Sequence, residues 1–121
     1  MSDTSDASAR KPIDASTLDA ARVFLSRIAA RYSLHEAILF GSRARGTHCE
    51  ESDAEIAVVL DDGEAERSAA ALDMAGIVFD VFLETGILFE ALPISREEME
   101  HPSWFSNPTL IENIRRGGVR L

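Results

Sequence analysis

The stretch that most limits the possible folds of this chain covers residues 38–60. A first apolar run ends at Gly41 and Ser42, and ten residues later Asp53 and Glu55 open a second apolar run. Because successive side chains on a strand point to opposite faces, Asp53 and Glu55 project from one face. A glycine turn after a strand exposes N–H groups that can hold phosphate, and two carboxylates can hold a divalent cation. The stretch therefore predicts a site for a nucleoside triphosphate with Mg²⁺.

The order and spacing of these residues resemble the signature of the DNA polymerase beta superfamily of nucleotidyltransferases, and most of all its minimal (MNT) members. That signature is Gly-Ser, ten residues and Asp-x-Asp; here it reads Gly41-Ser42 and Asp53-x-Glu55. The family form Gly-Ser-x-Ala-Arg-Gly is also present in the turn. Glu55 departs from the second Asp and offers Mg²⁺ the same oxygens on one more methylene. The resemblance covers roughly residues 14–121.

Composition narrows the class of protein. The chain has 121 residues, 45% of them hydrophobic, which is enough for one core. Its formal net charge of −9 makes nucleic acid an improbable partner, because binding nucleic acid needs a basic face. Cys49 is the single cysteine, so no internal disulfide can form. The sequence has no apolar run long enough for a membrane span and no signal-peptide pattern, and we expect a cytoplasmic protein.

The chain reads as a flexible tail over residues 1–12 and one domain over residues 13–121. The apolar spacing and turn residues predict the following elements: helices over 14–32 (with Ser16 as N-cap), from Ser42, over 64–75 (ended by Gly76), from Ser95 and from Pro108; and strands over 36–40, 54–60, 77–83 and 87–94. A capping box of Ser95 with Glu98 and a cap at Asn107 support the last two helices.

Asp80 is the single charged residue within the apolar run 77–83. An ionised carboxylate at such a place is costly unless it is paired or bound to metal. We therefore predict that Asp80 lies on a strand beside that of Asp53 and Glu55, and that it is the third acid of the site. The alternative is an aspartate of an edge strand that faces water.

Other polar side chains near the turn allow more than one interpretation. Arg43 and Arg45 could bind nucleotide phosphate or a partner, or could be surface charges on a one-turn helix. His48 lies between the turn and the acids and could approach the nucleotide, although with His35 and Cys49 it lacks the spacing of a zinc site. The pair Trp104-Phe105 could fill the core or contact a partner.

The resemblance implies an α+β fold, a small mixed twisted sheet flanked by helices as in the polymerase beta palm. It implies a Mg²⁺-dependent nucleotidyltransferase with ATP as substrate. Asp53, Glu55 and Asp80 would be catalytic and hold one or two Mg²⁺ ions. Gly41, Ser42, Arg43 and Arg45 would bind the nucleotide. In the MNT family the partner is a HEPN-domain toxin, and the MNT protein is the antitoxin that transfers AMP to a tyrosine of the toxin.

Two other functions remain open from the sequence. Because Glu55 departs from the signature, the domain could be a non-catalytic antitoxin module that neutralises its partner by covering it. A third possibility is a transferase that modifies a small hydroxyl compound without any protein partner.

Overall fold

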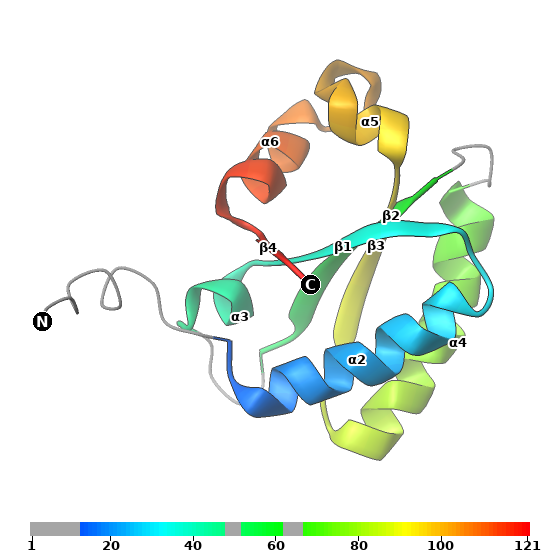
Figure 1. Ribbon diagram of the computed structural model, residues 1–121, viewed down its shortest axis with the longest axis vertical. Coiled ribbons are helices and arrows are strands. Elements are labelled where there is room, and N and C mark those ends of the chain that lie inside the picture. Colours follow the sequence, from blue (N-terminus) through cyan, green and yellow to red (C-terminus); the bar gives the residue numbers. More distant parts are fainter. Residues whose placement is uncertain (1–12, 48–51, 62–66) are drawn as a thin grey trace, which may run out of the picture.

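The computed structural model describes residues 13–47, 52–61 and 67–121, and its centre is a four-stranded mixed sheet (Figure 1). The strands lie in the order β3-β2-β1-β4. β1 pairs antiparallel with β2 and with β4, whereas β2 pairs parallel with β3. The expected α+β class, a small mixed sheet flanked by helices, is confirmed. The predicted tail over residues 1–12 lies outside the described residues, as do His48 and Cys49.

The elements follow one another along the chain with these bounds: α2 (Ala15–Ala29), β1 (Leu34–Phe40), α3 (Ser42–Arg45), β2 (Ala54–Leu60), α4 (Arg67–Thr85), β3 (Phe89–Ser95), α5 (Arg96–Glu100), the 3₁₀ helix η1 (Pro102–Trp104), α6 (Pro108–Gly117) and β4 (Val119–Arg120). β2 has the predicted bounds, and the predicted capping box of Ser95 with Glu98 starts α5. Asn107 caps α6 as predicted. The first helix begins at Ala15, within one residue of the predicted start, but its N-cap is Asp14 and not Ser16, and Asp14 accepts a hydrogen bond from the Thr17 N–H.

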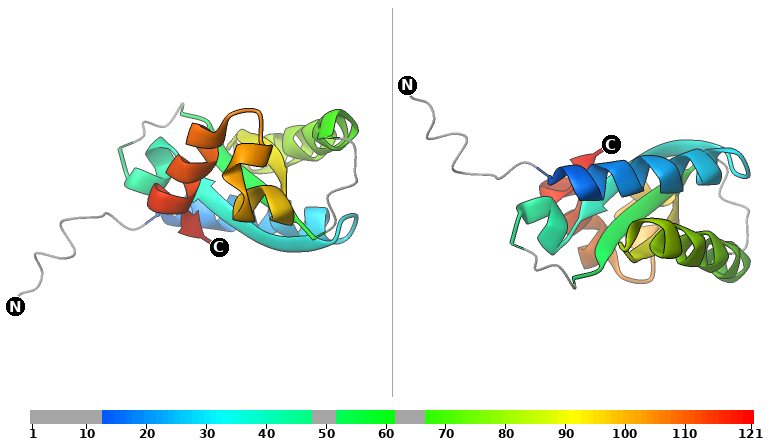
Figure 2. Two further views of the ribbon diagram at one scale, coloured as in Figure 1. Left: turned by 90° about the horizontal axis from the view of Figure 1, so that it is seen from above. Right: turned by 90° about the horizontal axis from the view of Figure 1, so that it is seen from below.

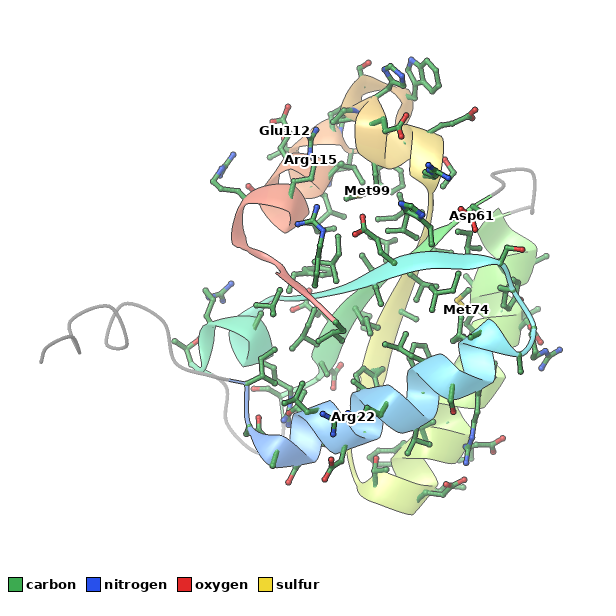
Figure 3. All side chains as sticks on the ribbon, in the orientation of Figure 1. Arg22, Asp61, Met74, Met99, Glu112 and Arg115 are labelled. Carbon is green, nitrogen blue, oxygen red and sulfur yellow. The ribbon has the colours of Figure 1, made fainter. Side chains whose placement is uncertain are left out.

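Helices cover both faces of the sheet. α2 and α4 lie against one face, and α5, η1 and α6 lie against the other (Figures 1 and 2). Met74 of α4 and Met99 of α5 lie on opposite sides of the sheet (Figure 3). The central strand β2 serves both layers, because Ile56 and Val58 pack under α2 and α4 while Ala57 and Val59 pack under α5 and α6. This explains the unbroken apolar run in the sequence of β2.

The structure corrects the prediction around Gly76. We expected a helix over 64–75 that ends at Gly76 and a strand over 77–83, but α4 continues without a break to Thr85. The glycine that follows the end of this helix is Gly86, which has a φ of 80° and donates its N–H to the Phe82 carbonyl oxygen at 2.8 Å. Such a left-handed glycine is a common helix C-terminus.

Tertiary packing explains why this segment is helical. Its β-branched and aromatic residues favour a strand locally. The buried residues Met74, Ile77, Val78 and Val81, however, recur at steps of three, one and three, which is the spacing of one helix face. A strand would bury every second residue, whereas here Val78 is buried and Asp80 is exposed.

The 19-residue helix α4 is the longest helix that the structure describes. None of the helices within the described ranges combines the length and the apolar character needed to span a membrane.

Candidate active site

Two glutamates meet on neighbouring parallel strands. Glu55 of β2 is directly opposite Glu90 of β3 in the strand register. Glu55 alternates with the buried residues of β2 that pack under α2 and α4, so its side chain belongs to the face covered by α5 and α6. Asp53 precedes β2 by one residue and lies two positions before Glu55. These three residues form the acidic cluster of the site.

Glu90 was not among the predicted site residues. We expected Asp80 to be the third acid, on a strand beside β2, but Asp80 lies on α4, on the opposite face of the sheet from Glu55. Its carboxylate is exposed and acts electrostatically on Arg27 of α2. The strand predicted for Asp80 is therefore wrong, and β3, the strand that does lie beside β2, carries Glu90.

A sequence signal for Glu90 did exist. Leu88 and Phe89 before it and Ala91 and Leu92 after it place one acid within an apolar run, just as Asp80 is placed within residues 77–83. Only the helical spacing of the buried residues in α4 separates the two runs. Residues 77–83 are also rich in the β-branched residues typical of a strand. The sequence therefore offered two candidates, Asp80 and Glu90, for the third acid.

The charge of Glu55 is unfavourable in its surroundings. Burial raises the pKa of Glu55, and the carboxylates of Glu90 and Asp53 raise it further, while the Arg45 guanidinium acts in the opposite direction. Repulsion among carboxylates of this kind is relieved by a cation bound between them.

The predicted glycine turn lies directly against this cluster. Gly41 has a φ of 80°, which strongly favours glycine, and it is the N-cap residue of α3. A Cβ atom at position 41 would overlap with the Glu55 carboxylate. The turn therefore brings its backbone into contact with the second acid of the motif. Ser42, the first residue of α3, is half-buried, and its carbonyl oxygen accepts the Thr47 N–H at 3.0 Å.

Arg43 has a different position from the one expected. Its side chain is only 4% exposed, so it is neither a phosphate ligand at the surface nor a solvated charge, and both interpretations are corrected. Nε donates to the Ser52 carbonyl oxygen at 3.0 Å, and Nη1 donates to the Thr17 hydroxyl at 2.7 Å and lies 3.9 Å from Asp14 Oδ1. Arg43 thus joins α3 to the start of α2 and to the residue that precedes Asp53.

A cavity of about 660 Å³ opens beside Gly41 and Glu55. This volume is within the range of small-molecule sites. Its lining comes from the end of β1 and the turn, from β2 and from α6: Phe40, Gly41, Arg45, Thr47, Glu55, Leu110, Asn113 and Gly117. Arg45 is exposed and lines this cavity, and its role in nucleotide binding stays a prediction.

The α6 wall of the cavity was missed by sequence reasoning. Leu110, Asn113 and Gly117 lie at helical spacing on the side of α6 that faces the cavity. Asn113 is held in place by Arg116, whose Nη1 donates to Asn113 Oδ1 at 3.3 Å. Their spacing shows that they share a helix face, but the sequence does not show that this face closes over Glu55.

The acidic cluster has the donor chemistry that Mg²⁺ requires. Within residues 13–47, 52–61 and 67–121, no three acidic, histidine or cysteine side chains are gathered closely enough to form a metal centre as they stand. Asp53, Glu55 and Glu90 nevertheless offer carboxylate oxygens, which are the ligands that hard cations prefer. Burial first, and then the neighbouring carboxylates of Glu90 and Asp53, raise the pKa of Glu55, and a bound cation would stabilise its charged form.

Comparison with known families decides the class of the domain. The family model for the polymerase beta nucleotidyltransferase domain matches residues 24–87, which is more than half of the chain. The chain belongs to the polymerase beta nucleotidyltransferase family. The match to this nucleotidyltransferase family includes Gly41, Asp53 and Glu55 and ends shortly before Glu90. It supports nucleotidyl transfer as the general chemistry of the domain.

Similarity to solved structures adds no information on activity. A crystal structure of a "putative nucleotidyltransferase" from Sulfolobus solfataricus has 17% sequence identity and a TM-score of 0.48 to this nucleotidyltransferase, over 91% of this chain and 88% of the other. At that identity the similarity cannot be extended to substrate or partner. A comparison with curated proteins found no match.

Proposed function

We propose that this nucleotidyltransferase transfers AMP from ATP, with Mg²⁺, to a tyrosine hydroxyl of a HEPN-type toxin, and that it acts as the antitoxin of that toxin. The observation that carries the transferase part is the position of Glu55, which touches the Gly41 turn, lies opposite Glu90 and lines the cavity. The choice of partner rests on the resemblance to MNT proteins. The net charge of −9 is consistent with it, because an acidic protein attracts a basic toxin.

The acidic cluster would hold the metal. Asp53, Glu55 and Glu90 are the residues that would bind one or two Mg²⁺ ions, which supply charge neutralisation for the triphosphate and for the departing pyrophosphate. Gly41 and Ser42 would hold the terminal phosphates, because the turn that they form lies against Glu55 at Gly41. The exposed guanidinium of Arg45 adds positive charge at the same cavity.

The cavity can hold the rest of the nucleotide. Phe40 and Leu110 provide apolar surface for the base, and Thr47 and Asn113 provide hydrogen-bonding groups at its walls. Positioning of this kind is the main contribution that a nucleotidyltransferase makes, since the bond changes themselves need little covalent help from the protein.

In the transfer, the acceptor oxygen bonds to the α-phosphorus while the bond between that phosphorus and the pyrophosphate oxygen breaks. The acceptor hydroxyl must lose its proton, and a nearby carboxylate is the natural group to take it. Glu90 is suited to this role because it is exposed and lies on β3, which is an edge strand of the sheet. Glu90 therefore takes over the role that the sequence assigned to Asp80.

A specific observation keeps a second function open. Glu55 replaces the aspartate of the signature, and the acids within the described residues are not preassembled as a metal centre. Both features would suit an antitoxin that neutralises its partner by binding alone. A transferase for a small hydroxyl compound is the third candidate and would turn over without a protein partner.

Mass spectrometry separates the three functions. The product of the neighbouring gene is co-expressed with this chain, and its intact mass is compared with that obtained beside the Asp53→Asn variant. A gain in whole AMP units that the variant abolishes supports the proposal. A stable complex without a gain in mass supports the binding module. ATP consumption with a small hydroxyl compound, in the absence of complex and modification, supports the third candidate.

A further inference from the structure

The outward face of α4 is apolar along most of the helix. Leu72, Phe79 and Leu83 are 78%, 55% and 66% exposed, which is unusual for residues of this size. Exposed small residues, Ala75 and Gly76, lie between them. This set of five residues is called the α4 face below. It is notable in a chain of which 27% of the residues are charged.

The acids of α4 lie beside this face and not on it. Asp73 accepts a hydrogen bond from the Tyr32 hydroxyl at 2.6 Å and forms an ion pair with Arg31 at 2.8 Å. Glu84 forms an ion pair with Arg27 at 2.7 Å. All three partners belong to α2 or to the turn that follows it. Asp80, which adjoins Phe79 in the sequence, is exposed and acts electrostatically on Arg27 of α2. The five residues of the α4 face are uncharged, and the acids of α4 lie along its edge toward α2.

A shallow apolar groove continues the α4 face toward β3. It has a volume of about 340 Å³ and lies between α4 and the edge strand, with these lining residues: Ala71, Ala75, Val78, Phe79, Leu88, Phe89, Glu90 and Ala91. The exposed apolar surface is therefore broader than the helix alone.

The rest of this sequence has little apolar material to cover the face. The segments outside the described residues are 1–12, 48–51 and 62–66, and Met1 is their single large aliphatic or aromatic residue. These segments therefore do not supply the apolar surface that would cover the α4 face.

The α4 face is complementary to itself. Leu72, Gly76, Phe79 and Leu83 are spaced by four, three and four residues, which is the pattern of a helix-pairing seam. Positions 72 and 83 are symmetric about the midpoint between positions 77 and 78, and so are positions 76 and 79. An antiparallel copy would set Leu72 opposite Leu83, and Phe79 opposite the empty side of Gly76, so that a large side chain enters a gap.

We propose that the α4 face binds the α4 face of a second copy of this chain, antiparallel about a two-fold axis. The seam residues Leu72, Gly76, Phe79 and Leu83 are uncharged and suit like apolar surface, while Asp80 is exposed at the edge of the seam. The 19 residues of α4 span about 28 Å, and four of them form the seam. Stable complexes bury roughly 800 Å² per partner, which is more than one short helix seam supplies, so the dimer is weak and dependent on concentration.

Sedimentation velocity of the whole chain tests the proposal over a wide range of protein concentration. The wild-type protein is expected to move from monomer to dimer as the concentration rises. Leu72→Glu places a charge on the seam and is expected to leave the protein monomeric at every concentration. Trp104→Ala removes a side chain that is 61% exposed on the other layer, and this control is expected to dimerise like the wild type. A wild type that stays monomeric up to its solubility limit overturns the proposal and leaves the face to a different protein.

A glycine variant separates loss of the dimer from loss of the fold. A Cβ atom at Gly76 would meet no atom within 4 Å apart from its neighbours along the chain and the backbone of its own helix, so Gly76→Gln fits the monomer and favours its helix. The same side chain fills the gap into which Phe79 of the second copy enters. We expect a thermal midpoint at least as high as that of the wild type, together with loss of the dimer. An unchanged dimer would contradict the antiparallel register.

Cysteine pairing tests the direction of the two helices. In a Cys49→Ser background, Leu72→Cys protein is mixed with Leu83→Cys protein and oxidised at high concentration. The antiparallel seam predicts rapid formation of the mixed disulfide and slow formation of either symmetric one. Faster pairing of Leu72→Cys with itself would indicate a parallel contact and would overturn the register.

Discussion

At the scale of residues, Glu55 is the centre of the site because the other groups act on it. Gly41 lies against its carboxylate, Glu90 faces it across the parallel pair, and Arg45 offers a compensating charge. Its pKa is raised first by burial and then by the neighbouring acids. The folded protein therefore retains the proton of Glu55 to a higher pH than the unfolded chain does.

This shift predicts a gain in stability for Glu55→Gln at neutral pH. Ionised Glu55 destabilises the fold above its raised pKa, and this cost disappears as the pH falls through that pKa. The variant should melt a few degrees above the wild type at neutral pH, and the two should converge as the pH falls toward 4.5, the ordinary value for the group. Thermal melts across this pH range measure the difference. A variant less stable than the wild type at neutral pH would show that the ionised carboxylate makes net favourable contacts.

The assignment of the third acid predicts opposite results for two exposed carboxylates. Glu90→Gln should lower the rate of nucleotidyl transfer by roughly 10² to 10⁴, the usual contribution of a positioned proton acceptor. Asp80→Asn is the matched control, since it also removes one exposed carboxylate but lies on the far face of the sheet, and its rate should stay close to that of the wild type. Single-turnover rates with saturating ATP and Mg²⁺ give both values. The reverse result would return the role to Asp80.

The buried position of Arg43 predicts that its loss affects the stability of the fold and not catalysis directly. Arg43→Ala removes two hydrogen bonds of a buried charged donor and should lower the free energy of unfolding by about 2–3 kcal/mol. Arg22→Ala, whose ion pair with Asp19 is exposed on both sides, should change it by less than about 1 kcal/mol. Urea denaturation measures both. If the two variants were equally stable, the buried contacts of Arg43 would have no net value.

At the scale of elements, the two halves of the site differ in how far the sequence determines them. The positions of the turn and of the first two acids follow from nearby sequence, since Gly41, Asp53 and Glu55 lie on or next to strands that the apolar pattern predicts. The identity of the third acid depends on distant contacts. Residues 77–83 have strand-like composition, but they are helical because they pack against α2 and the sheet. The burial of Arg43 and the wall formed by α6 also depend on contacts between distant residues, and the sequence alone does not predict either.

The continuity of α4 predicts opposite effects for two glycines. Gly76 lies inside the helix, where an added Cβ atom would point into open space, so Gly76→Ala should stabilise the fold by about 0.5–1 kcal/mol. Gly86 has a φ of 80°, so Gly86→Ala should destabilise it by about 1 kcal/mol. Urea denaturation under monomeric conditions compares the two. If Gly76 ended a helix, as its sequence context indicated, the first substitution would destabilise instead.

At the scale of the whole molecule, the cavity lies where the sheet meets the helical layer that contains α6. Its walls come from β1, α3, β2 and α6, so a nucleotide bound there would contact segments from both ends of the domain. Binding of this kind stabilises the entire fold against unfolding and not one segment alone.

A thermal shift tests this at the same scale. ATP with Mg²⁺ at about 100 times its dissociation constant should stabilise the wild type by roughly 2.7 kcal/mol. Asp53→Asn, or removal of Mg²⁺ with a chelator, should reduce the shift. A wild type whose melting temperature does not respond to ATP and Mg²⁺ would argue for the binding module in place of the transferase.

The parallel pairing of β2 with β3 also has a consequence for the order of folding. Antiparallel β1 and β2 bring the turn to the first two acids across a short separation in sequence, whereas Glu90 reaches Glu55 only after all of α4 has crossed between the strands. Contacts that close over a longer separation cost more chain entropy and form more slowly. The acidic cluster is therefore completed late. A chain still leaving the ribosome would carry its first two acids without the third, and transfer would begin only once folding was nearly finished.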